Sequence, residues 1–159
     1  MAVFYSFHYE RDAARVQQIM QMGAVGGQTL LNSQEWETVR GRGNAAVEEW
    51  IDAQMKNKSA VVVLIGAETA GRRWVNHEII KAWNEKRPLL GIEINRLAPL
   101  NLSPDPRGAN PFAQIKTKDG HALSEYLPIF TPTGRTSADV YNDIRANLSS
   151  WVARGYVRS

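Results

Sequence analysis

A carboxylate and an indole are spaced to meet on one predicted helix near the middle of the chain. Residues 72–86 form an amphipathic helical pattern that stops before a proline. Glu78 follows Trp74 by four residues, one helical turn, on a stripe rotated roughly 90° from the apolar stripe. Because Glu78 lies nearest the apolar edge, the spacing predicts a partly desolvated carboxylate beside an aromatic ring. A solvated glutamate paired with Lys81 or His77 is the alternative.

Aromatic residues near the N-terminus extend the same candidate site. Phe7, His8 and Tyr9 close the predicted first strand and would present aromatic surface and a polar tip at its carboxyl end. Trp36 lies in a polar, glycine-containing stretch, residues 32–43, which predicts a loop that carries an unexpectedly large aromatic residue. Phe7 as ordinary core and Trp36 as local packing are the alternatives.

Several familiar chemistries are excluded because their motifs are missing from the sequence. No G-x-x-x-x-G-K-[ST] motif occurs, and the glycines of residues 23–27 lack the G-x-G-x-x-G order of a dinucleotide-binding turn. No G-x-S-x-G elbow supports a hydrolase triad, and the central predicted strand ends in Gly66-Ala67, where a phospho-receiver needs aspartate. Since the chain has no cysteine and its three histidines lack ligand spacing, we expect no metal site.

Alternating strand and helix patterns predict an α/β fold. Residues 59–66 form an apolar run without alternation, which is typical of a strand covered on both faces in a parallel sheet. Further strands are predicted at 3–9, 28–32, 88–94 and 127–131, and helices at 10–22, 44–56, 72–86 and from 137 onward. This order indicates a flavodoxin-like, doubly wound parallel sheet of about five strands, which binds its ligand at the carboxyl ends of the strands.

Two polar residues are expected to begin helices. Asn44 is the predicted N-cap of one helix, and Ser137 is the predicted cap of the last, on which Trp151 shares the apolar face. Residues 95–127 hold most of the prolines and predict a long irregular excursion, a kind of segment that often carries function. We therefore expect residues 1–159 to form a single domain with this excursion.

The overall composition limits the partners and the location. A net charge of +3 without a basic block predicts no nucleic-acid partner, although the excess of Lys and Arg at 72–96 could attract a phosphorylated small molecule. No apolar run approaches the roughly 20 residues of a membrane helix, and the N-terminus lacks the features of a signal peptide. We expect a cytoplasmic protein with no membrane partner.

Taken together, these segments resemble a known family. The strand at 3–9, the strand at 60–66 and the helix Arg73-Trp-Val-Asn-His-Glu-Ile79 are similar to the signature of TIR and TIR-like domains. The G-x-N-P-F segment at 108–112 and the C-terminal segment 151–156 narrow the resemblance to the ThsB family of bacterial Thoeris antiphage systems. The likeness runs over nearly the whole chain.

The resemblance implies an enzyme that cleaves NAD. In catalytic TIR domains a glutamate on this helix is essential, and Glu78 holds the matching position, where it would accept hydrogen bonds from the hydroxyls of the nicotinamide-side ribose. Phe7 and Trp74 match aromatic positions that line the nicotinamide pocket. Further substrate contacts are expected from His8, Tyr9 and Trp36. NAD would be the substrate and no cofactor is needed; nicotinamide would leave, and ADP-ribose would close to a cyclic isomer.

The resemblance also implies partners. The cyclic product would act as a second messenger on a separate effector protein, and contacts between TIR domains would form a homo-oligomer. Two alternatives stay open: a non-catalytic TIR-like scaffold or adaptor, and an enzyme that transfers ADP-ribose to another acceptor. Glu78 discriminates between catalysis and scaffolding, since an adaptor does not require a glutamate there. The product isomer, the effector and the trigger are left open by the sequence.

Overall fold

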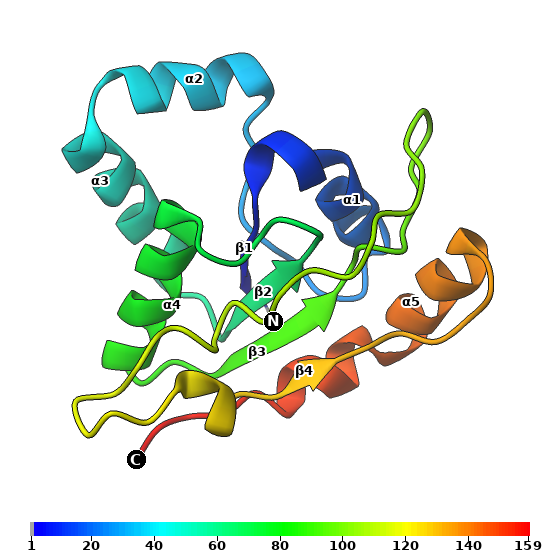
Figure 1. Ribbon diagram of the computed structural model, residues 1–159. Coiled ribbons are helices and arrows are strands. Elements are labelled where there is room, and N and C mark those ends of the chain that lie inside the picture. The colour runs from blue at the N-terminus through cyan, green and yellow to red at the C-terminus, as the bar shows by residue number, and fades with distance from the viewer. Residues whose placement is uncertain (1) are drawn as a thin grey trace.

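Parallel strands form the centre of the molecule, which a computed structural model describes over residues 2–159. In that part of the chain the sheet has four strands in the order β1-β2-β3-β4, and neighbouring strands are parallel. Their bounds are β1 Phe4–Ser6, β2 Val61–Ile65, β3 Leu89–Glu93 and β4 Ile129–Phe130. The interior position of β2 and its complete burial confirm the covered strand predicted from the apolar run (Figure 1).

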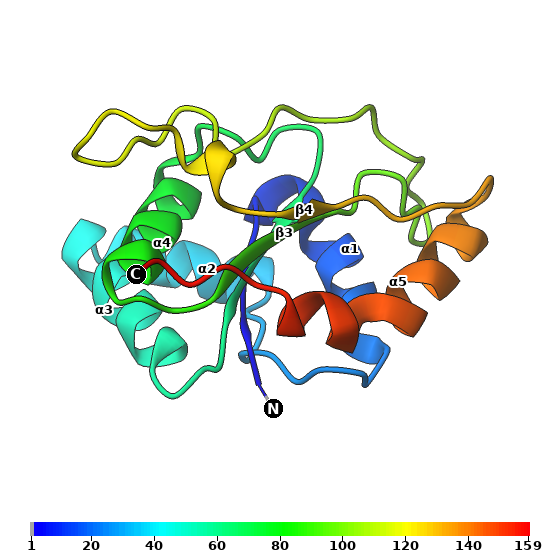
Figure 2. The ribbon, with the colours of Figure 1, turned by 90° about the horizontal axis from the view of Figure 1, so that it is seen from below.

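Helices cover both faces of this sheet (Figure 2). Over the described residues they are α1 Tyr9–Gln21, α2 Ser33–Gly41, α3 Asn44–Met55, α4 Arg73–Asn84 and α5 Ser137–Ala153. Apolar residues of α1 and α5 pack on one face of the sheet, and those of α2, α3 and α4 pack on the other. The predicted doubly wound, flavodoxin-like α/β fold is confirmed. Within residues 2–159, no helix combines the length and apolar character that a membrane crossing requires.

The fifth strand, expected at residues 28–32, does not form. That segment is irregular, and the side-chain amide of Gln28 takes the place of a neighbouring strand by accepting from Tyr5 N at 2.9 Å and donating to Tyr5 O at 2.7 Å. The preceding Gly27 lies so close to the Tyr5 ring that a Cβ atom would be 2.8 Å from it. One buried side chain therefore forms the hydrogen bonds that the backbone N–H and C=O of Tyr5 would otherwise make with a neighbouring strand.

Residues 32–43 are not a loop, because α2 occupies most of them. Asn32 and Glu35 form a capping box: Glu35 N donates to Asn32 Oδ1 at 2.8 Å, and Asn32 N donates to Glu35 Oε1 at 3.0 Å. The Asn-x-x-Glu spacing was a usable signal for this helix. Its polar composition obscured the signal, because Trp36 is its only buried residue.

The first strand ends three residues earlier than predicted. Pairing of β1 with β2 covers Phe4–Ser6, and Tyr9 is already the first residue of α1. His8 occupies the N-cap position with an extended backbone. Phe7, His8 and Tyr9 therefore lie at a strand-to-helix turn, where the chain reverses direction at the carboxyl end of β1.

Two predicted helix caps were wrong by one residue. Gly43 precedes α3 at φ 100°, a conformation that favours glycine, and Asn44 is the first helical residue. Thr136 caps α5 by accepting from Asp139 N at 3.1 Å, and Ser137 is the first helical residue. Ser137 instead accepts a hydrogen bond from the backbone N–H of Ala98 at 2.7 Å. It thereby ties α5 to the irregular segment.

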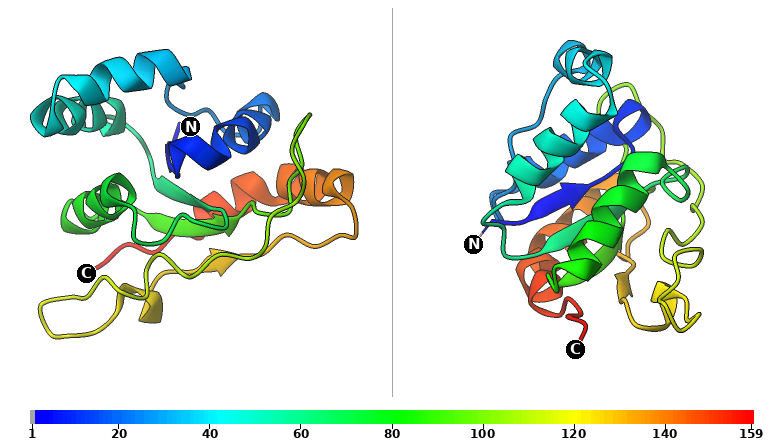
Figure 3. Two further views of the ribbon diagram at one scale, coloured as in Figure 1. Left: turned by 45° about the horizontal axis from the view of Figure 1, so that its top comes forward. Right: turned by 90° about the vertical axis from the view of Figure 1, so that its left-hand side faces the viewer.

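Residues 95–127 run along the outside of the sheet beside β4 and contain one short 3-10 helix, η1 (Leu123–Glu125) (Figures 2 and 3). A buried arginine of α1 fixes their first part. Arg15, 1% exposed, donates to the carbonyl oxygens of Leu97 and Ser103 at 2.8 Å each. The same guanidinium donates to Asp12 at 3.0 Å, so its buried charge is paired.

We expect Trp151→Ala to destabilise the protein by about 3–5 kcal/mol, the usual cost of removing a buried aromatic side chain. Trp151 lies on the buried face of α5, 9% exposed, and stacks on Phe130 of β4 with ring centroids 5.4 Å apart. Urea unfolding of both proteins measures the difference. Since Ser150 is exposed on the same helix, Ser150→Ala is the control. A loss below about 1 kcal/mol for Trp151→Ala would contradict this packing.

Candidate active site

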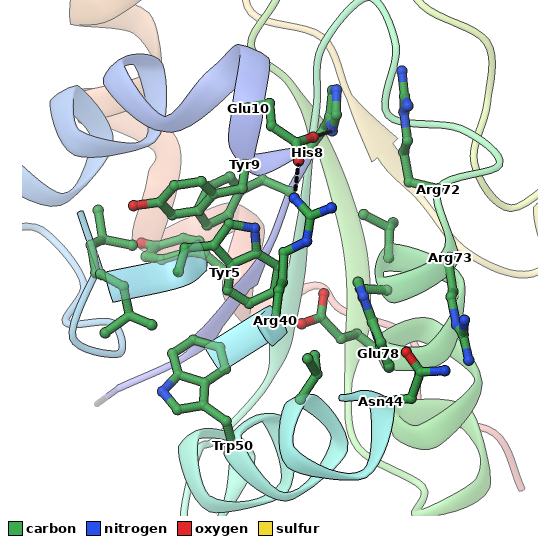
Figure 4. Close-up of a pocket in the computed structure, with 17 residues that line it drawn as sticks. Tyr5, His8, Tyr9, Glu10, Arg40, Asn44, Trp50, Arg72, Arg73 and Glu78 are labelled. Atoms are coloured by element: carbon green, nitrogen blue, oxygen red, sulfur yellow. Dashed lines mark hydrogen bonds and ion pairs between the residues drawn. The ribbon is translucent and has the colours of Figure 1, made fainter. Parts of the chain in front are cut away.

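A cavity of about 440 Å³ opens where β1 ends and α4 begins, with α2 and α3 along its other side (Figure 4). It is the place that a doubly wound sheet offers for a ligand. All six candidate residues from the sequence line it: Phe7, His8, Tyr9, Trp36, Trp74 and Glu78. The remaining lining residues are Tyr5, Glu10, Leu30, Leu31, Arg40, Asn44, Val47, Trp50, Arg72, Arg73 and Val75.

Glu78 is buried in the wall of this cavity. Its side chain comes from α4, it is 7% exposed, and Figure 4 shows the carboxyl group pointing into the cavity. Ser6 Oγ of β1 donates a hydrogen bond to Glu78 Oε1 at 2.6 Å. Burial raises the pKa of Glu78 from 4.5 to about 8, and the hydrogen bond from Ser6 opposes that rise. The carboxyl group is more desolvated than the sequence predicts.

The alternative of a solvated, ion-paired Glu78 is wrong. Lys81, the proposed partner one turn along, pairs with Glu85 and with Asp52, the latter at 3.2 Å. His77 packs edge-on against Trp74 at a centroid distance of 5.7 Å. Within residues 2–159, the Glu78 carboxyl group accepts one hydrogen bond, from Ser6, and forms no ion pair.

Aromatic rings form a continuous wall on the side opposite α4. Phe7 stacks with Tyr9 at 5.7 Å, Tyr9 stacks with Trp36 at 5.5 Å, and Trp36 meets Trp50 edge-on at 6.0 Å. Trp36 therefore enters the wall from a helix. Trp50 was not among the candidates, because its spacing on α3 looks like that of ordinary core residues. Such a wall offers flat apolar surface to a planar ligand.

His8 lies at the turn between the wall and α1. It is nearly buried, with Nδ1 3.4 Å from Glu10 Oε2. Burial, and then the positive charge of Arg72, lower the pKa of His8 below its ordinary value of 6.5. The imidazole is therefore mainly neutral at pH 7, and it can donate or accept a hydrogen bond.

Three arginines that were not among the candidates from the sequence also line the cavity. Arg40 of α2 extends across it to Glu10 of α1, donating to Oε1 at 2.7 Å (Figure 4). Arg72 and Arg73 stand at the start of α4, and the Arg73 guanidinium lies 4.9 Å from the centre of the Trp74 ring. These residues bring guanidinium groups to two sides of the cavity. Their convergence depends on the tertiary fold, so only the basic excess at 72–96 hinted at it.

The donor set suits an organic anion with planar rings better than a metal. In the part of the chain that the structure describes, no three His, Asp or Glu side chains cluster as metal ligands. Guanidinium groups match phosphate oxygens, and the aromatic wall matches planar rings. The buried carboxyl group between them can stabilise positive charge on a bound molecule.

The fold and the cavity define a TIR-like α/β domain. Residues 4–99 match the family described as Thoeris protein ThsB, TIR-like domain, and the chain belongs to that family. A relative from Bacillus cereus (strain MSX-D12), named "Putative cyclic ADP-D-ribose synthase ThsB1", is 29% identical over an alignment of 135 residues. That alignment covers 78% of this chain and 69% of the relative.

Replacing Glu78 with glutamine should stabilise the fold at higher pH. The unfolded carboxyl ionises near 4.5, whereas the folded one holds its proton until about pH 8. Between these values the unfolded state binds fewer protons, so the wild-type unfolding free energy should fall by up to about 1.4 kcal/mol per pH unit. Glu78→Gln lacks this titration. Urea unfolding of both proteins between pH 4.5 and 8 measures this difference. If the unfolding free energies of the two proteins change with pH in parallel, Glu78 is not a buried carboxyl group in solution.

Proposed function

We propose that this protein cleaves NAD, releases nicotinamide and closes the ADP-ribose portion into a cyclic isomer. The buried Glu78 carboxyl in a cavity walled by aromatic rings and arginines is the observation that carries the proposal. The name of the Bacillus cereus relative, "Putative cyclic ADP-D-ribose synthase ThsB1", supports the same chemistry. NAD brings a cationic ring, two ribose groups, a diphosphate and an adenine, and the cavity offers a complement to each kind of group.

Each part of NAD has a chemical counterpart in the lining. The cationic nicotinamide ring would lie against the faces of Phe7 and Trp74, where cation–π attraction favours it. Arg40 would bind the diphosphate, since its guanidinium already holds a carboxylate at the cavity mouth. The stacked rings of Tyr9 and Trp36 provide further flat surface for the rest of the dinucleotide.

Bond cleavage requires charge stabilisation more than proton transfer. The bond between C1′ of the ribose and the ring nitrogen breaks, and its electron pair stays with nicotinamide, which leaves neutral. The ribose becomes an oxocarbenium-like cation, which the Glu78 carboxylate stabilises while accepting hydrogen bonds from the ribose hydroxyls. A hydroxyl of the adenosine ribose then attacks C1′ and loses its proton to solvent, which closes the ring.

Substrate binding would set the charge on Glu78. With a pKa of about 8, the carboxyl group is mainly protonated at neutral pH before NAD arrives. The positive nicotinamide ring favours the ionised form, so NAD binding would lower the pKa and release a proton. The carboxylate then stands in a desolvated site, where its charge acts on the ribose more strongly than in water.

The proposed product is a messenger for a separate effector protein in antiphage defence. This part of the proposal rests on the match to a family of Thoeris proteins, and in it the nucleotide carries a signal from this protein to a second one. Attack by water would give linear ADP-ribose instead, and attack by another acceptor would transfer ADP-ribose to it. Mass spectrometry of the nucleotides formed from NAD distinguishes these three products.

Glu78→Gln should reduce nicotinamide release by about 100- to 1000-fold, the usual effect of removing one preorganised electrostatic group. The amide keeps the shape of the side chain and can still accept from Ser6, so folding and most NAD affinity should persist. Glu49→Gln, an exposed α3 substitution outside the cavity, is the matched control. Nicotinamide release should be measured over a range of protein concentrations, because self-association would make the specific activity rise with concentration.

Equal nicotinamide release by wild type and Glu78→Gln would remove the carboxylate from the reaction. If neither protein releases nicotinamide while both are folded, a scaffold that binds another TIR domain becomes the better description. Thermal melts run alongside show whether a loss of release reflects a loss of folded protein.

Arg40→Gln should raise the KM for NAD by about tenfold, with kcat changed much less. The arginine would contact the diphosphate equally in the ground and transition states, so its loss weakens binding without changing the chemical step. Its present partners, Glu10 and Glu37, are both exposed and need no replacement. Arg145→Gln on α5, away from the cavity, controls for the lost positive charge. An unchanged KM would place the diphosphate elsewhere.

A further inference from the structure

The hydroxyl group of Ser6 lies behind the proposed catalytic carboxylate. We propose that Ser6 is a positioning residue, whose hydrogen bond fixes the Glu78 carboxyl group and favours its ionised form. Ser6 is completely buried at the end of β1 and is not among the residues that line the cavity. It would not touch substrate, so its effect must pass through Glu78. This role rests on the proposed function.

The geometry allows a charge-assisted hydrogen bond once the carboxyl group is ionised. Ser6 Oγ and Glu78 Oε1 are 2.6 Å apart, within the range for a hydroxyl that donates to a carboxylate. The bond joins residues 72 positions apart in sequence, on the first strand and on α4. Because Oε1 is held from the sheet side, rotation of the carboxyl group is restricted, which limits the directions that the second oxygen can take.

Ser6 is also the group that opposes the desolvation of Glu78. Burial disfavours the carboxylate, and the hydroxyl donor stabilises it. Other titratable or charged groups face the same cavity from the neighbouring elements, and α3 contributes none of them: they are His8, Tyr9 and Glu10 of the α1 turn, Tyr5 of β1, Arg40 of α2, and Arg72 and Arg73 of α4. Over residues 2–159, none of these groups hydrogen-bonds or ion-pairs with Glu78.

A purely structural serine would behave differently. If Ser6 only fills space in the sheet, its replacement by alanine changes stability and leaves the ionisation of Glu78 unaltered. If it stabilises the carboxylate, the same replacement raises the pKa of Glu78, because the protonated form needs this donor less. The ionisation of Glu78 is therefore the property that separates the two roles.

The direct test is the carboxyl titration of Glu78 in the ligand-free protein. Carbon-13 NMR of glutamate-labelled protein follows the carboxyl signals, and Glu78→Gln identifies the resonance that disappears. In Ser6→Ala the midpoint of that resonance should rise by about one pH unit or more, the amount that a hydrogen bond to a charged group supplies. An unchanged midpoint in folded Ser6→Ala overturns the proposal.

Kinetics supply the second measurement. The pH profile of kcat for nicotinamide release should move to higher pH in Ser6→Ala by a similar amount, with the KM for NAD changed less. Ser6→Thr keeps the hydroxyl and should restore the wild-type profile, whereas Ser6→Cys, a weaker donor, should fall between. Restoration by Thr and not by Ala supports positioning. Equal profiles for Ala and Thr contradict it.

The two proposals can fail separately. If the wild type does not cleave NAD, the titration still decides whether Ser6 controls the ionisation of Glu78, and only its catalytic consequence is lost. If NAD is cleaved while the Ser6→Ala titration is unchanged, the proposed function stands and the positioning role falls. Should Ser6→Ala not fold, the Thr and Cys variants carry the same comparison of titration midpoints.

Discussion

Parallel pairing of β1 with β2 is the constraint on which the rest of the structure depends. Parallel strands bring their carboxyl ends to one edge, so the turn after Ser6 and the start of α4 meet there although they are far apart in sequence. The turn supplies Phe7, His8 and Tyr9, and α4 supplies Glu78. The remaining wall comes from α2 and α3, which the long connection between the two strands places beside that edge.

Close packing at the carboxyl end of β2 also depends on elements that the sheet brings to this edge. A Cβ atom on Gly66 would lie 2.1 Å from the Asp12 carboxylate, and one on Gly108 would lie 2.1 Å from Gly66 O. The irregular segment can therefore touch the strand end only where residue 108 is glycine, and Asp12 of α1 can lie against the same strand end only where residue 66 is glycine. Arg11 holds that segment from α1 through two hydrogen bonds to Asp105, at 2.8 and 3.0 Å. A largely irregular excursion is thus fixed by paired charges and by backbone contact.

Local periodicity made α4 and the buried strand predictable from sequence, since each pattern extends over many residues with one period. It also placed Trp74 and Glu78 on one stripe, and both line the cavity. Helix α2 was missed because its stability comes from a local cap and one tryptophan, and little apolar surface marks its buried side. The roles of Gln28 and Arg40 could not be predicted from the neighbouring sequence, because their hydrogen-bond partners lie on other elements. Desolvation of Glu78 was underestimated for the same reason: α4 packs against β1 there, and the periodicity of the helix does not show this contact.

The cost of burying Glu78 and the proposed chemistry have one physical origin. A carboxyl group with a pKa of about 8 resists ionisation, so the folded protein is less stable with the charge than without it. That same desolvation would make the charge effective once a cationic ring enters, since the attraction between them grows as water is excluded. Ser6 lowers the free-energy cost of ionising Glu78 through a hydrogen bond from the sheet side, and it leaves the side of the carboxyl group that faces the cavity uncovered. A buried, singly hydrogen-bonded carboxylate is therefore poorly suited to stabilising an empty fold and well suited to stabilising a transient cation, which favours the catalytic reading of this TIR-like domain over the scaffold.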